Sequence, residues 1–472
     1  MLAPISLLLG TAMIDLLSFF TAILICIPAI LMSIRKSNYL VDYMFLVIAT
    51  NRCIRRIVDY HNGYFNPFSL ISLTPIIVGG LATMVVLLEL NNRKERFGKR
   101  TKDVLIIYGL AVSMAFVIGF LNAKFGAVYA LGDFIAPIGL IGFASLYAND
   151  QSIIDRWSES FAATALLVAV YGIWQFYTIP PWDAFWLVSV KMTGYMGFPE
   201  PMKMTLFSTM NERGPAAMFL CNGLIILLLR PKTLGFLRFP ALVAVGYAML
   251  LTYSRTTVIF AALAAILYPL INRGTGIVPI LFVTVVAIVF GPSLMSILPG
   301  RAAERVETVG AITDDFSFRS RIVLLDGALR NSLSEPLGLG IGNSGLASRV
   351  QAASRAGISD STGYVETLRI YGWIGFLMIV VTLWRIWKSS RELLVLGMDD
   401  TNIRLFRAWF LSGMAALFSG NWLASASFFW VLAGYSLGRM DGVEEELAQE
   451  EEDDEDEVSE EEFLDNPNSV NA

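Results

Sequence analysis

Four arginines interrupt or border strongly apolar stretches of this chain: Arg213, Arg255, Arg319 and Arg321. An arginine near the middle of a bilayer costs about 3 kcal/mol on insertion scales, so each of these side chains must reach water or bind an anion. The guanidinium fork matches phosphate oxygens with two parallel hydrogen bonds. A site made of several arginines therefore suits a diphosphate whose negative charge is neutralised by the protein itself.

Carboxylates accompany these arginines in the sequence. Asp360 and Glu366 flank the start of an apolar stretch in "SDSTGYVETLRIYGWIGF" (359–376). A carboxylate can take a proton from an attacking hydroxyl, although its ordinary pKa near 4 makes it a weak base unless apolar surroundings raise that pKa. Ordinary capping of a helix start is the alternative interpretation, both here and for Asn211, which precedes Arg213.

A glycine-rich stretch, "PLGLGIGNSG" (336–345), follows the apolar residues after Arg321. The apolar residues between Arg321 and Leu333 recur at helical spacing, which predicts an amphipathic helix at the membrane surface. The glycine-rich turn could present backbone N–H groups to a phosphate.

Membrane-spanning helices are the elements expected to position these residues. Hydrophobic residues make up 55% of the 472-residue chain and charged residues only 16%, against about 25% charged in soluble domains. The apolar residues form continuous stretches, which favours helices of about 20 residues over alternating strands. The predicted fold is an all-α, polytopic transmembrane bundle of about 12–14 spans.

Basic segments predict the orientation of the chain, because Lys and Arg are retained in the cytoplasm. The strongest are "NNRKERFGKRTK" (91–102), "LRPKTLGFLR" (229–238) and "WRIWKSSREL" (384–393). With alternating spans from a short span at 37–53 onward, the segments expected outside are 54–68, 179–205, the tight corner at Arg255, and a long periplasmic loop, 299–363. Arg255 then lies at an interface, where its long side chain reaches water.

The acidic C-terminal segment is expected to be a separate unit. From Asp441 onward the chain has 16 Asp and Glu residues and no Lys or Arg. Like charges repel, so we expect a transmembrane catalytic domain at 1–440 and a disordered cytoplasmic tail at 441–472. The rest of the chain is net basic, which suits an anionic lipid or substrate.

Metal and disulfide chemistry are not indicated by the sequence. The chain has a single histidine, His61, and three scattered cysteines. A histidine-based metal site and a disulfide framework are therefore not expected.

The ordered set of motifs resembles the O-antigen ligase and O-antigen polymerase-like glycosyltransferases of bacterial inner membranes. The motifs are "TMNERGPAA" (209–217), "LTYSR" (251–255), "RSRIVLLDGAL" (319–329) leading to "EPLGLGIG" (335–342), and "YVETLRIYGWIGF" (364–376). In the N-terminal half, "RRIVDY" (55–60) is similar to a segment of exopolysaccharide polymerases.

The resemblance implies a periplasmic loop over a groove, a glycan donor on undecaprenyl diphosphate, and an inverting reaction without metal or cofactor. By motif position, Arg255 and Arg321 would hold the diphosphate, with Arg319 close to Arg321 in sequence. Asn211, Arg213 and Glu366 are the further substrate-binding candidates.

The family's histidine, its proposed base, has no counterpart at the matching position of this chain. Counting from Gly372 puts Ser361 there, and a shift of one residue puts Asp360 there. Asp360 is the preferred catalytic residue, because a serine alone is a poor base. His61 could reach the site only by long-range folding.

The leading functional hypothesis is a polymerase that joins lipid-linked repeat units at the periplasmic face of the bacterial inner membrane. A ligase that transfers a finished glycan to lipid A core or protein is the alternative. A transporter or flippase is the second alternative, with Asp133 in "LGDFIAPIG" (131–139) as its candidate charge, where Pro137 could break a helix. Expected partners are membrane lipids, a flippase and chain-length regulators, and no nucleic acid.

Overall fold

The computed structural model describes residues 16–66, 69–91, 97–271, 335–343, 363–398, 400–417 and 427–465, with 322–323, 325–327, 329–330 and 332. These residues form helices and turns and contain no β-strand, which confirms the predicted all-α class for the described part of the chain. The described pieces between Ile322 and Ser332 are helical, as the apolar spacing there predicts.

Six helices among the described residues are long and apolar enough to cross a bilayer. They are α2 (Leu16–Ile34), α4 (Thr74–Leu90) with the preceding turn η1 (Leu70–Leu73), α5 (Lys99–Ala123), α6 (Phe125–Leu146), α7 (Gln151–Thr178) and α18 (Gly363–Val395).

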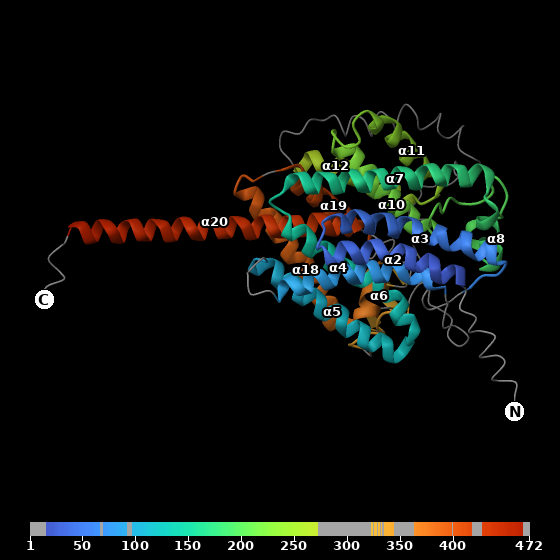
Figure 1. Ribbon diagram of the computed structural model, residues 1–472, viewed down its shortest axis with the longest axis horizontal. Helices are drawn as coiled ribbons and strands as arrows, with labels where there is room; N and C mark the ends of the chain where they lie inside the picture. Colours follow the sequence, from blue (N-terminus) through green and yellow to red (C-terminus); the bar gives the residue numbers. More distant parts are fainter. Residues whose placement is uncertain are drawn as a thin grey trace.

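Shorter or more polar helices complete the described bundle. They are α3 (Tyr39–Asn62), α8 (Pro181–Ser189), α9 (Thr193–Met196), α10 (Arg213–Leu229), the turn η2 (Gly235–Leu237), α11 (Arg238–Leu251), α12 (Arg255–Ile271), α19 (Thr401–Ala416) and α20 (Ser427–Asp465). Most of the long helices lie side by side along one axis (Figure 1).

An aromatic cluster joins four of these helices in the core. Phe161 of α7 stacks on Phe219 of α10 with ring centroids 4.5 Å apart and meets Phe45 of α3 edge-on at 5.1 Å. Phe428 of α20 packs against Phe161 at 5.4 Å. Such pairs contribute about 0.5–1.5 kcal/mol each beyond their buried area, so they fix how α3, α7, α10 and α20 pack together.

Ion pairs gather at one end of the bundle, which we call the ion-paired end. Six pairs define it: Arg100 with Glu392 and with Glu444, Arg385 with Asp103, Arg230 with Asp155, Lys36 with Glu89, and Arg156 with Asp42. Arg100, Arg230 and Arg385 belong to the three basic segments that the sequence predicts to face one side of the membrane. The structure brings all three segments to the same end.

The acidic segment differs from its prediction. Helix α20 continues to Asp465 and extends beyond the bundle at the ion-paired end (Figure 1), where the sequence predicts disorder. The first half of α20 is buried, so the helix is already nucleated, and glutamate propagates a helix well.

The predicted domain boundary at 440/441 also crosses a packed contact. The carboxylate of Asp441 accepts hydrogen bonds from the backbone N–H of Thr101 (3.1 Å) and of Arg100 (3.0 Å). Asp441 therefore binds the start of α5 rather than beginning a separate tail.

Helix α3 is longer than the predicted span 37–53. It continues through Asn62 and ends at Gly63, whose φ of 75° favours glycine. The predicted outer loop 54–68 is therefore wrong for 54–62, and "RRIVDY" lies on a helix. The charges of this segment do not end the helix, because Arg55 pairs with Asp59 at 3.4 Å within it.

The predicted corner before Arg255 is confirmed. Helix α11 ends at Leu251 and α12 begins at Arg255, so only 252–254 connect them. The Thr252 hydroxyl donates to the Met249 carbonyl at 2.6 Å, which closes the end of α11.

Candidate functional site

The starts of α10, α12 and α18 share the end of the bundle opposite the ion-paired end, which we call the loop end. Arg230, directly after α10, contacts Asp155 and Ser158 near the start of α7, so α10 ends at the ion-paired end and begins at the loop end. Arg238 at the start of α11 donates to the Leu227 carbonyl at 2.8 Å, so α11 runs back toward the loop end. Helix α12 then begins there.

Helix α18 has the same polarity as α10. Arg385 in its second half bonds Asp103 at the start of α5 at 2.5 Å, so its first residues lie at the loop end. The backbone thus brings four candidates to one end: Asn211, Arg213, Arg255 and Glu366. Arg255 is the first residue of α12, and Glu366 lies in the first turn of α18. Arg319, Arg321, Asp360 and Ser361 lie outside the described residues.

Arg213 lies in the first turn of α10 and is half-buried. Its guanidinium carbon is 4.3 Å from the centroid of the Tyr195 ring, a cation–π contact that holds the side chain at the loop end. A cation in the first turn opposes the helix dipole, so it does not stabilise the helix there. An anion bound beside Arg213 would gain from both the guanidinium and the first-turn N–H groups.

Asn211 does not cap α10. Its side chain is buried, and its Oδ1 accepts a hydrogen bond from Arg56 Nη1 at 3.2 Å. The N-cap residue of α10 is Glu212, which makes no side-chain cap bond. The capping interpretation of Asn211 is therefore wrong, and the residue belongs to a buried network centred on Arg56.

Arg56 of α3 is fully buried and donates hydrogen bonds to three further partners besides Asn211. Its Nε donates to Asp183 Oδ1 at 2.6 Å, its Nη1 to the Met210 carbonyl at 2.5 Å, and its Nη2 to the Ser208 carbonyl at 2.5 Å. The aromatic rings of Trp186 and Phe207 lie 5.7 Å and 5.0 Å from the guanidinium carbon. Arg56 thereby ties α3 to α8 and to the segment just before α10.

Asp183 of α8 is satisfied on both carboxylate oxygens. Its Oδ2 accepts from the Tyr171 hydroxyl at 2.8 Å and from Gln175 Nε2 at 2.6 Å, both on α7. Gln175 Oε1 in turn accepts from the Ser208 backbone N–H at 2.7 Å. A buried ion pair is tolerated when its remaining polar atoms are hydrogen-bonded in this way.

Ser208 shows how tightly this network holds the 205–211 segment. Its φ is 52°, a left-handed conformation that costs of order 1–3 kcal/mol and persists only where the surroundings impose it. The Ser208 hydroxyl donates to the Val168 carbonyl at 2.5 Å, in addition to its bonds with Arg56 and Gln175. The network therefore positions the backbone that leads to Asn211 and Arg213.

The sequence did not predict this network. Asp183 is an isolated acid among aromatic residues in "PPWDAFW" (180–186), and Arg56 is a base on a partly apolar helix. An acid isolated in apolar surroundings needs a base, so the isolation of Asp183 was the available signal. Their separation of 127 residues left the pairing undetermined.

The glycine-rich segment 335–343 packs into the bundle and does not leave its backbone open to a phosphate. The N–H groups of Leu339 and Gly340 donate to the carbonyls of Arg369 (2.7 Å) and Ile370 (3.0 Å), and that of Ile341 donates to Ala115 (2.9 Å). The turn itself is confirmed, with positive φ at Gly338, Gly340 and Gly342. The Gly338 N–H also has an acceptor, the Glu335 carbonyl at 2.9 Å, so the expectation that these N–H groups bind a phosphate is wrong for the four that are already bonded.

Helix α18 is broken where this segment meets it. Gly372 has φ 61° and ψ −171°, and the N–H of Trp373 donates to the Pro336 carbonyl at 2.9 Å. The carbonyls of Arg369 and Ile370, freed by the break, accept the two N–H groups of the glycine-rich segment. Non-helical backbone at membrane depth is stable when protein groups satisfy it in this manner.

The remaining candidates have ordinary surroundings. His61 is exposed in the last turn of α3, with its ring 5.6 Å from that of Tyr60. Asp133 lies on α6, which continues through Pro137, so the predicted break there is wrong.

Cys26, Cys53 and Cys221 are buried free thiols. Within the described ranges, no group of three or more His, Cys, Asp or Glu residues could hold a metal ion.

Comparison with known protein families found no matching family, and no curated protein matches the chain. The relation to polysaccharide polymerases and ligases therefore rests on the resemblance of the motifs alone.

Proposed function

We propose that the chain is a membrane polysaccharide polymerase that joins oligosaccharide repeat units carried on undecaprenyl diphosphate. The observation that carries the proposal is that α10, α12 and α18 all run from the loop end toward the ion-paired end, so Arg213, Arg255 and Glu366 lie in the first turns of three helices with the same direction. Arginines that reach the same side of the membrane from different helices are able to neutralise a diphosphate leaving group.

The proposed reaction is a metal-independent, inverting glycosyl transfer. A hydroxyl oxygen of one repeat unit attacks the anomeric carbon of the growing chain, and the bond from that carbon to the diphosphate oxygen breaks. The diphosphate leaves on its lipid, held by Arg255, Arg321 and Arg319. Asp360 accepts the hydroxyl proton, while the substrate is held by Asn211, Arg213 and Glu366.

The same proposal includes the membrane placement. The loop end faces the periplasm with the loop 299–363, and the ion-paired end faces the cytoplasm of the bacterial inner membrane, since the basic segments gather there. The chain crosses the membrane about 12–14 times. A flippase that delivers repeat units and chain-length regulators are the proposed protein partners.

A transporter is the second candidate, and the break in α18 favours it. Secondary transporters place substrate at discontinuous helices, and α18 is interrupted at Gly372 beside a non-helical segment. In this chain the backbone groups at the break are hydrogen-bonded to the segment 335–343, which supports a structural role for the break rather than a substrate site.

The test replaces Arg255 and Arg213 singly with alanine in a strain that lacks the native copy. Polymer yield should fall at least tenfold in both variants, whereas Arg391→Ala, an exposed arginine near the end of α18, should leave it unchanged. Unchanged polymer in both variants would contradict the proposal. The deletion strain separates the alternatives: unpolymerised repeat units indicate a polymerase, long unattached chains a ligase, and repeat units retained on the cytoplasmic side a flippase.

A further inference from the structure

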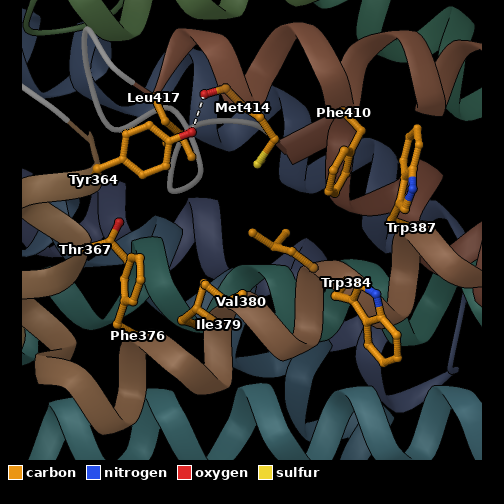
Figure 2. Close-up of a pocket in the computed structure, with 11 residues that line it drawn as sticks. Tyr364, Thr367, Phe376, Ile379, Val380, Trp384, Trp387, Phe410, Met414 and Leu417 are labelled. Carbon is orange, nitrogen blue, oxygen red and sulfur yellow. Dashed lines mark hydrogen bonds between the residues drawn. The ribbon is translucent and has the colours of Figure 1, made fainter.

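An apolar groove of about 240 Å³ runs between α18 and α19. Figure 2 shows its lining side chains, which extend from Tyr364 and Leu417 at one end to Trp384 and Trp387 at the other. The other lining residues are Thr367, Phe376, Ile379, Val380, Leu383, Phe410 and Met414. The groove follows the direction of the two helices and so lies along the bundle axis.

The lining offers hydrocarbon and almost nothing polar. Its two hydroxyl groups are already used, because the Tyr364 hydroxyl donates to the Met414 carbonyl at 2.6 Å and the Thr367 hydroxyl to the Gly363 carbonyl at 2.7 Å. An occupant of this groove therefore gains from apolar contact and finds no free hydroxyl partner in the lining. A hydrocarbon chain is the ligand of that chemistry.

Positive charge lies at the tryptophan end of the groove. Lys388 Nζ is 5.7 Å from the Trp384 ring, and the Arg407 guanidinium carbon is 4.8 Å from the Trp387 ring. Both cations lie toward the ion-paired end, since α18 runs toward that end and α19 runs away from it. Glu392 approaches Lys388 at 3.6 Å but also binds Arg100, so its charge is shared between two bases.

We propose that this groove binds an acyl chain of an anionic phospholipid, with the lipid phosphate beside Lys388 and Arg407. Tryptophan rings and basic side chains at one level are the pattern that holds a lipid headgroup at a membrane interface. The charges sit at one end of the groove and the hydrocarbon lining continues away from them, which matches the layout of a phospholipid.

The occupant differs from the proposed glycan donor. The donor's diphosphate would lie at the loop end, where Arg213 and Arg255 are, whereas the cations of this groove lie toward the opposite end. The inference therefore stands whether or not the chain is a polymerase, and it needs only that the protein lies in a bilayer.

The test measures lipid that remains bound to the purified protein in mild detergent, by native mass spectrometry, after incubation with equal amounts of phosphatidylglycerol and phosphatidylcholine. The native protein should retain phosphatidylglycerol at least fivefold over phosphatidylcholine. Val380→Trp, which fills the groove, should reduce bound lipid about tenfold. Leu377→Trp is the matched control, because Leu377 is exposed on the same helix but does not line the groove.

A second variant tests the headgroup contact without filling the groove. Lys388→Gln should lower the preference for phosphatidylglycerol at least twofold while leaving the melting temperature of the protein unchanged. Equal lipid binding by Val380→Trp and Leu377→Trp, no preference for the anionic lipid in the native protein, or an undecaprenyl phosphate displaced from the groove by Val380→Trp would each overturn the proposal.

Discussion

Replacing Arg56 with methionine should destabilise the protein more than any change at an exposed ion pair. The substitution leaves the buried Asp183 carboxylate without its counter-ion, and removing one partner of a buried pair costs about 3–5 kcal/mol. Two carbonyls, of Ser208 and Met210, also lose a donor. Tyr171 and Gln175 still hydrogen-bond Asp183, which limits the penalty. We therefore expect a loss of about 4 kcal/mol in the free energy of unfolding.

The assay is reversible unfolding in mixed micelles, followed by tryptophan fluorescence. Lys203→Met provides the contrast, because the Lys203–Glu200 pair is exposed, with 66% and 56% of the two side chains accessible. The free energy of unfolding of that variant should fall by less than about 1 kcal/mol. The double variant with Arg56→Met and Asp183→Leu should recover part of the loss, because an apolar pair of similar volume no longer buries an unpaired charge.

Two results would refute this account of Arg56. One is a loss within 1 kcal/mol of that measured for Lys203→Met. The other is a double variant whose loss equals the sum of the losses of Arg56→Met and Asp183→Leu, since independent residues add and coupled residues do not.

Three further outcomes follow from individual contacts. Gly340→Ala should lower the melting temperature more than Gly397→Ala. Both glycines have φ near 77°, but only at Gly340 would a Cβ overlap the Gly119 backbone. Equal melting temperatures would contradict the packing of 335–343. Asp400→Ala should lower the stability by about 1 kcal/mol in thermal melts, because Asp400 Oδ1 caps α19, whereas Asp400→Asn keeps the acceptor and most of the stability. Hydrogen bonds from Ser152 lower the pKa of Asp150 below its ordinary 3.8, so the protection of the first turn of α7 from hydrogen exchange should be present above pH 4 and fall as the pH drops through the lowered pKa. Asp150→Asn should remove this pH dependence.

Local patterns in the sequence predicted the helical class, the corner at 252–254 and the meeting of the three basic segments. Each of these features depends on the length of an apolar stretch or on the charge of the residues that follow it. These two properties are read from neighbouring residues in the sequence. The role of Asn211 before α10 was not predicted, because it depends on Arg56, which is 155 residues away in the sequence.

The features that the sequence did not predict depend mostly on contacts between residues that are distant in the sequence. The pairing of Arg56 with Asp183 and the insertion of 335–343 against Gly372 require knowledge of which helices are neighbours. The length of α20 was not predicted, because the burial of its first half, which nucleates the helix, depends on contacts with other helices. The end of α3 was missed because its charges pair within the helix rather than facing water.

Glycosyl transfer by the purified protein tests the central proposal most directly. The protein is reconstituted in liposomes with radiolabelled, undecaprenyl-diphosphate-linked repeat units and without added metal, and the products are resolved by length. The account predicts a ladder of lengthened lipid-linked glycans, lost in Arg255→Ala and retained in Arg391→Ala. Repeat units that stay single with the native protein, or a ladder that is the same in Arg255→Ala, would contradict it.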